Sequence, residues 1–171
     1  MTSQPQRKPN RLKGFDYSTP SAYFVTICTK DRQCLLGSIV GAAISRPPSL
    51  VPTQVGKVVD AAIQAIPAHY PTVHVDKYVV MPNHVHLLLM FSPPADGRLI
   101  AAPTSAVGSD APSLSQVVGH MKRVVSRTLG TSLWQKSFHD HVIRNLNEYR
   151  LIWEYIDTNP FRWTEDCFFQ P

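Results

Sequence analysis

The chain of 171 residues has only three cysteines, Cys28, Cys34 and Cys167, and none of them stands in a Cys-x-x-Cys spacing. This excludes a disulfide-stapled fold and a cysteine-ligated zinc site, and it predicts reduced thiols in a cytosolic protein. No run of 18 apolar residues occurs, so no segment is expected to span a membrane. Residues 1–14 hold no apolar stretch of the kind that a secretory signal needs.

Charged residues are also few, at 17%, and 17 basic residues against 12 acidic ones leave a net charge of +5. A modest positive excess favours a polyanionic partner over a neutral or cationic one. Hydrophobic residues make up 43%, which is enough for a core and excludes a wholly disordered chain. The length is that of one compact domain with tails.

What the chain has in excess is proline, with 15 residues that gather in a few places. Residues 1–20 are polar, basic and interrupted by proline, and we interpret them as a flexible N-terminal arm. Residues 37–53 and 92–112 consist of small residues and proline, and we predict that both are surface loops. The expected domain runs from 21 to 165, and a short tail follows at 166–171.

The segments between the prolines show strand and helix patterns in alternation. Alternating aromatic and β-branched residues predict strands over 22–30, 73–82, 84–91 and 133–144. Apolar residues at helical spacing predict helices over 54–66, 114–129 and 146–159, the last two capped by Ser113 and Asn145. The first six elements follow the β-α-β-β-α-β order of the ferredoxin-like α+β fold, a four-stranded antiparallel sheet with two helices on one face. The seventh element is an added C-terminal helix.

Two histidines, His84 and His86, stand in an apolar strand just after the turn of a predicted hairpin. Side chains two residues apart on a strand point to the same face, so these imidazoles can hold one metal ion. The alternative is a hydrogen-bonded core histidine beside a solvent-facing one. His139 and His141 repeat the spacing on a later predicted strand, and they either complete a four-histidine cluster or lie in solvent.

The predicted C-terminal helix places Tyr155 and Asn159 four residues apart, on one face. A phenol is a usable nucleophile where a cation stabilises the phenolate, and an amide oxygen suits a hard divalent ion. Taken alone, the pair is also explained by a core aromatic residue and a helix cap before Pro160.

Cations gather on the predicted helix 114–129 and in the N-terminal arm. The candidates for contacts with DNA phosphates are Arg11, Lys13, Lys122, Arg123 and Arg127. Such contacts set affinity and salt dependence but carry little sequence information. Ordinary solvated cations are the alternative.

The chain resembles the single-tyrosine HUH transposases, and among them most closely the REP-associated tyrosine transposases, in residues 78–88, 133–144 and 154–160. The resemblance implies a ferredoxin-like catalytic core in which His84 and His86 bind a divalent metal, Mg²⁺ or Mn²⁺. Histidine ligands by themselves would suit zinc or manganese better than magnesium. The resemblance also implies that Tyr155 is the nucleophile and that Asn159 is the third metal ligand, and we expect the three ligating atoms within about 5 Å of one another.

By the same resemblance, the protein is expected to cut and rejoin single-stranded DNA that carries hairpins of the REP type. The reaction would leave a 5′-phosphotyrosine link and a free 3′-OH. A bacterial, cytoplasmic, nucleoid-associated protein is expected, as a monomer or a homodimer. Two alternatives stay open: a catalytically inactive regulator that binds single strands on the same fold, and a metal-dependent hydrolase that acts through water and leaves Tyr155 without a role.

Overall fold

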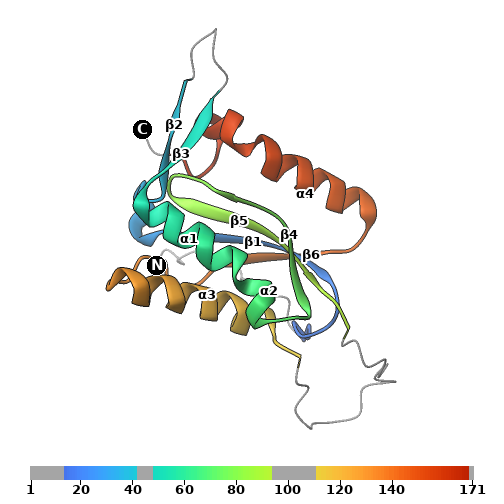
Figure 1. Ribbon diagram of the computed structural model, residues 1–171. Helices are drawn as coiled ribbons and strands as arrows, with labels where there is room; N and C mark the ends of the chain where they lie inside the picture. Colours follow the sequence, from blue (N-terminus) through green and yellow to red (C-terminus); the bar gives the residue numbers. More distant parts are fainter. Residues whose placement is uncertain (1–13, 42–47, 94–110, 170–171) are drawn as a thin grey trace, which may run out of the picture.

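The computed structural model describes residues 14–41, 48–93 and 111–169 (Figure 1). The elements in the N-terminal half are β1 (Ala22–Cys28), the 3-10 turn η1 (Lys30–Arg32), β2 (Gly37–Val40), β3 (Ser49–Pro52), α1 (Gln54–Gln64), α2 (Ile66–His69) and β4 (Val73–Val80). Those that follow are β5 (His84–Phe91), α3 (Leu114–Leu129), β6 (His139–Ile143), α4 (Leu146–Thr158) and the 3-10 segment η2 (Asn159–Glu165).

The main sheet has four strands in the order β4-β5-β1-β6, and every neighbouring pair is antiparallel. The strands β4 and β5 form the predicted hairpin, and β1 and β5 form the centre of the sheet. The predicted α+β fold with a four-stranded antiparallel sheet is therefore confirmed.

Each face of the sheet is covered by a different layer. On β5, Val85, Leu87 and Leu89 pack into the main core with residues of α1 and α3. The intervening Leu88 packs with Ile156 of α4 on the other face. Figure 1 shows this arrangement, with α1 and α3 on one side of the sheet and α4 on the other. Because side chains alternate along a strand, His84 and His86 belong to the face that α4 covers.

The caps that the sequence predicts are present. The Ser113 hydroxyl accepts a hydrogen bond from the Gln116 amide at the start of α3, and Gly130 ends that helix with a φ of 66°. At the start of α4, the Asn145 side chain accepts from the Glu148 amide. These caps satisfy helix-end amides that would otherwise lack partners, and they fix where each helix begins.

Three of the predicted boundaries are wrong. Segment 37–53 was expected to be a loop, but its described parts form a two-stranded antiparallel ribbon, β2 with β3. This ribbon pairs only with itself and is largely exposed, so its sequence lacks the apolar alternation of a half-buried strand. The strand predicted over 133–144 is confined to β6, and Trp134 makes only an isolated bridge to Thr29. Helical structure also continues past the predicted end at residue 66, because Pro67 occupies the first turn of α2, where proline is tolerated.

Part of the predicted N-terminal arm belongs to the core. Tyr17 is buried and stacks on Tyr23 of β1, and Phe15 packs edge-on against both rings. Residues 94–110 of the second predicted loop lie outside the described residues, as do Arg11 and Lys13. Within the described ranges, no helix combines the length and the apolar character that crossing a bilayer requires.

Candidate metal and nucleophile site

Two buried imidazoles meet at the start of β5. His84 and His86 have exposed fractions of 0% and 1%, and their Nε2 atoms lie 3.0 Å apart. The Nδ1 atom of each ring makes a hydrogen bond on the side away from this contact. His84 Nδ1 lies 2.9 Å from Asn83 Oδ1, and His86 Nδ1 lies 2.9 Å from the Thr26 hydroxyl. The two Nε2 atoms therefore converge on one point, as the binding of one metal ion by both rings would require.

Asn83 determines which nitrogen of His84 carries the proton. Its amide nitrogen donates to two backbone carbonyls, Arg32 at 3.1 Å and Phe168 at 2.8 Å. Its amide oxygen must therefore accept, and the donor is the Nδ1–H of His84. The lone pair of His84 then sits on Nε2, where it is available to a metal ion.

Both imidazoles are held neutral. Burial lowers the pKa of His84 to about 4, against a smaller raising effect of the Asp166 carboxylate. The pKa of His86 is lowered well below its usual range, first by burial and then by the neighbouring His84. A neutral imidazole is the form that ligates metals.

Helix α4 brings the phenol of Tyr155 to this pair. Its hydroxyl lies 3.2 Å from His86 Nε2, and the residue is 40% exposed. The ring packs edge-on against Phe24 of β1, which fixes its position above the sheet. Burial raises the pKa of Tyr155 to about 12, and the negative charge of Asp166 adds to this effect. The phenol is thus protonated at neutral pH and reaches both the histidines and solvent.

Asn159 lies one turn beyond Tyr155 and is buried. Its amide nitrogen donates to Asp166 Oδ2 over 2.9 Å. Its Oδ1 atom is buried and has no hydrogen-bond partner among the described residues. Leaving a buried oxygen unpaired is costly, so this atom is suited to receive a cation or another donor.

Asp166 completes the cluster, although it falls within the predicted tail at 166–171. Its Oδ2 atom lies 3.9 Å from His84 Nε2 and 3.5 Å from the Tyr155 hydroxyl. Its other oxygen accepts from the Phe168 amide. One ligand atom from each of His84, His86 and Asp166 falls within 4.8 Å of the others. These three residues, with the orphaned Asn159 oxygen, form a nitrogen and oxygen donor set that fits a divalent metal.

The chain reaches this position because η2 folds back over the same face of the sheet that α4 covers. Trp163 is buried in η2, with its ring centroid 6.0 Å from that of His84, and Phe168 covers His84 at 4.7 Å. No local pattern around residue 166 predicts this return, because it depends on contacts with strands far away in the sequence.

The other predicted residues lie elsewhere. His139 and His141 are exposed and outside this cluster, and His141 Nε2 lies 2.6 Å from Glu148 Oε1. The Lys122 ammonium is used inside the fold, where it donates to the carbonyls of Gln135 and Ser137. Arg123 and Arg127 are exposed on α3, across the sheet from Tyr155.

Known proteins share this fold. A structure of a REP-associated tyrosine transposase bound to a REP hairpin superposes with a TM-score of 0.59 at 21% identity, over 93% of this chain and 73% of that one. A candidate transposase from Deinococcus radiodurans R1 matches with a TM-score of 0.46 at 18% identity, over 86% of this chain and 97% of that one. This chain has the REP-associated tyrosine transposase type of fold, as the sequence predicts.

Sequence similarity to a known protein shows the family to which the chain belongs. The chain is 30% identical over 170 residues to an uncharacterized protein of Haemophilus influenzae, across 94% of this chain and 91% of that protein. The chain belongs to the same family as that protein. No family model matches it.

Proposed function

We propose that this protein is a metal-dependent endonuclease and strand transferase for single-stranded DNA, with Tyr155 as the nucleophile. The observation that carries the proposal is the Tyr155 hydroxyl, 3.2 Å from His86 Nε2 at the edge of a buried His-His-Asp cluster. A structural core, a hydrolase or a binding module has no need for a half-exposed phenol at that position.

The cluster residues would hold the metal, Mg²⁺ or Mn²⁺. His84, His86 and Asp166 would each supply one ligand atom, and the unpaired Asn159 amide oxygen would supply a fourth. When bound, the ion supplies positive charge that offsets the charge of a scissile phosphate. Asn83 and Thr26 hold the two imidazole rings in ligating orientations.

The proposed step forms one bond, between Tyr155 and phosphorus, and breaks one bond within the DNA. Its oxygen attacks the phosphorus, the bond from phosphorus to the 3′ oxygen breaks, and the products are a 5′-phosphotyrosine and a free 3′-OH. The phenol proton leaves to solvent, since the residue is 40% exposed, and the departing 3′ oxygen takes up a proton from solvent. The phosphotyrosine conserves the energy of the broken ester, so a 3′-OH can reverse the step on another strand without an external energy source. The helix α4 provides the in-line position by holding the ring above the sheet.

The substrate that we propose is single-stranded DNA with a hairpin, as in REP-like repeats. Two observations support it: the net charge of +5 and the similarity to a transposase whose structure holds a REP hairpin. With such a substrate, the protein would act at the bacterial nucleoid in the cytoplasm. We propose that it acts as a monomer or a homodimer. The catalytic unit that we propose begins near residue 14 and extends through Asp166, because both ends pack against the predicted 21–165 domain.

The test is a covalent adduct. Wild-type protein is incubated with labelled hairpin-containing single strands and Mn²⁺, and a denaturing gel separates free DNA, cleaved DNA and protein-linked DNA. Tyr155→Phe removes one oxygen and keeps the ring, so it should bind DNA as the wild type does and lose cleavage and adduct together. Tyr149→Phe is the matched control on the same helix, because the Tyr149 hydroxyl donates to Asp76 and lies outside the cluster.

Each other outcome has a defined meaning. An adduct with Tyr155→Phe contradicts the assignment of the nucleophile. Cleavage by Tyr155→Phe without an adduct indicates that water attacks, which supports the hydrolase. Tight binding of single strands by the wild type, with neither cleavage nor adduct in any divalent metal, supports the inactive regulator.

A further inference from the structure

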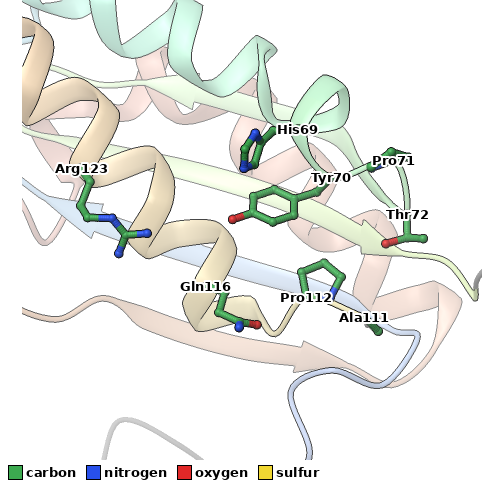
Figure 2. A pocket seen from close by; sticks show the side chains of 8 residues that line it. All are labelled: His69, Tyr70, Pro71, Thr72, Ala111, Pro112, Gln116 and Arg123. Carbon is green, nitrogen blue, oxygen red and sulfur yellow. The ribbon is translucent and has the colours of Figure 1, made fainter. Parts of the chain in front are cut away.

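A groove lies on the opposite face of the sheet from Tyr155, between the turn that joins α2 to β4 and the first half of α3 (Figure 2). Its volume is about 650 Å³. The residues that line it are His69, Tyr70, Pro71, Thr72, Ala111, Pro112, Gln116 and Arg123. None of them contributes to the metal and nucleophile site.

Three flat rings gather beside this groove, Tyr70 and His69 from the α2 side and His120 from α3. The Tyr70 ring meets His69 edge-on at 4.7 Å and His120 edge-on at 5.7 Å. The two histidine rings lie 4.0 Å apart at an angle of 35°. Figure 2 shows the Tyr70 ring projecting across the gap toward α3. A half-buried aromatic cluster beside a groove of this size is a platform on which an unpaired base can stack.

The opposite wall offers hydrogen-bond donors and positive charge. The Arg123 guanidinium is exposed and forms no ion pair with any described residue, and Arg127 follows one turn later. The Gln116 amide oxygen accepts from the Ser113 amide, and its nitrogen is a hydrogen-bond donor. None of the lining residues is acidic. The positive character also shows at His120, whose pKa is lowered by burial and then by His69, Arg123 and Arg127.

We propose that this groove is a second DNA site, where one unpaired nucleotide stacks its base on Tyr70 and sets its phosphate against Arg123. The base suits the ring cluster, and the phosphate suits a guanidinium that forms no ion pair with the described residues. That the nucleotide belongs to the DNA substrate rests on the proposed function.

The groove is connected to the metal site by one sheet edge. Thr72 precedes β4, the edge strand, and Val80 at its far end pairs with Val85 beside the two histidines. Eight strand residues at ~3.3 Å each separate the two sites by roughly 25 Å. A single strand that leaves the metal site would therefore pass around β4 to reach the groove, so the second site acts on unpaired DNA several nucleotides from the cleaved bond.

The experiment measures binding without cleavage. Hairpin oligonucleotides with single-stranded flanks of graded length, from none to about ten nucleotides, are titrated by fluorescence anisotropy in EDTA. Tyr70→Leu should weaken binding of long-flank oligonucleotides by about tenfold, since stacking one base contributes ~1–3 kcal/mol. Arg123→Gln should weaken it similarly and reduce the slope of log K against log salt by about one. Both should bind the flankless hairpin as the wild type does.

Arg150→Gln is the charge-matched control, because Arg150 is exposed on α4, on the other face of the sheet. It should leave affinity and salt slope within twofold of the wild type. Photocrosslinking of wild-type protein to flanks that carry bromodeoxyuridine should label the peptide containing Tyr70, which keeps the test valid if Tyr70→Leu folds poorly. Unchanged binding by Arg123→Gln together with no crosslink at Tyr70 would overturn the proposal, and so would equal losses with the flankless hairpin.

The two proposals fail separately. A normal covalent adduct with flank-independent binding by the variants removes the groove proposal alone. If the variants lose affinity only for flanked oligonucleotides and the wild type forms no adduct, the groove proposal stands and the proposed catalytic function is wrong.

Discussion

The Nε2 atoms of His84 and His86 face each other across 3.0 Å in a buried position. Asn83 holds the proton of His84 on Nδ1, so His84 Nε2 is an acceptor. In the metal-free protein the second Nε2 atom, on His86, must then be a donor. The Thr26 hydroxyl is compatible with both neutral tautomers of His86, because it can donate to an unprotonated Nδ1 or accept from a protonated one. Metal binding at both Nε2 atoms would therefore require only that the His86 proton move from Nε2 to Nδ1, with no change in the charge of the pair.

Metal binding should stabilise the fold through this pair. Mn²⁺ at one hundred times its dissociation constant should raise the free energy of unfolding by about 2.7 kcal/mol. For a chain of this size that corresponds to roughly 5–10 °C in Tm, measured by thermal unfolding with and without EDTA. His86→Ala should abolish the metal-induced shift, whatever its effect on the metal-free protein.

The control for this measurement is His139→Ala. His139 of β6 pairs with Thr26 of β1, yet it is exposed and outside the cluster. The variant should keep the full metal-induced shift. A shift that survives in His86→Ala, or that disappears in His139→Ala, would show that the ion binds elsewhere.

The metal-free protein should lose stability as the pH falls below about 6.5. The folded-state pKa of His84 is lowered to about 4 and that of His86 is lowered well below its usual value of 6.5. The unfolded chain therefore binds more protons than the folded one in this window, and the stabilisation present above pH 6.5 is lost toward pH 4. For His84 alone the loss is on the order of 3 kcal/mol.

Urea unfolding in EDTA at pH 7, 5.5 and 4.5 measures this loss. His84→Gln should flatten the decline, because it removes the proton-binding group and keeps a polar side chain. His139→Ala, at an exposed histidine outside the cluster, should leave the decline as in the wild type. Constant or rising stability between pH 6.5 and 5 would contradict the buried neutral state.

Local patterns predicted the parts of the site that lie within single elements. The spacing of His84 and His86 needs only strand alternation, and that of Tyr155 and Asn159 needs only helical periodicity. Apolar periodicity likewise located the hairpin and the capped helices. Lys122, by contrast, was grouped with the exposed arginines, and its inward turn depends on carbonyls in a segment 13 and 15 residues away.

The missed features are those that tertiary contacts create. Asp166 enters the site because η2 folds back over the α4 face of the sheet and Phe168 packs on His84. The Tyr70 groove joins residues about 50 positions apart in sequence. The β2 and β3 ribbon is stabilised by mutual pairing, and its proline and small residues resemble a loop.

Gly56 should tolerate no side chain. A Cβ at this position in α1 would lie 1.9 Å from the Leu36 carbonyl oxygen, which is backbone and cannot rotate away. Gly56→Ala should therefore destabilise the protein by about 2 kcal/mol or more, in spite of the better helix propensity of alanine. Chemical unfolding measures the change in free energy.

Gly119 is the matched control on α3. A Cβ there would find only the Arg123 side-chain nitrogen, at 3.6 Å, which is ordinary contact. Gly119→Ala should stabilise the protein by about 0.5–1 kcal/mol, because alanine loses less backbone entropy in a helix. Equal effects of the two substitutions would contradict the close approach of α1 to Leu36.

Asp166→Asn should lower the pKa of Tyr155 and weaken metal binding at the same time. Asparagine keeps the shape of the side chain and has one accepting oxygen, so it can accept from either Asn159 or the Phe168 amide. The packing of Phe168 on His84 should keep the segment in place. It removes the negative charge 3.5 Å from the phenol, which is the second cause of the raised pKa. Because burial is the first cause, the pKa should fall from about 12 but stay above the ordinary value of 10.

The pKa is measured in metal-free protein by NMR of ¹³Cζ-labelled tyrosine, with Tyr155→Phe to assign the resonance. The same variant should show a smaller Mn²⁺-induced rise in Tm than the wild type. Asp157→Asn is the control, because Asp157 is exposed on the same helix, pairs with Lys77 and should change neither quantity. An unchanged pKa of Tyr155 in Asp166→Asn, with a full metal shift, would show that Asp166 packs beside the site without acting on it. A lowered pKa with a full metal shift would leave Asp166 as an electrostatic neighbour of the nucleophile and remove it from the ligand set.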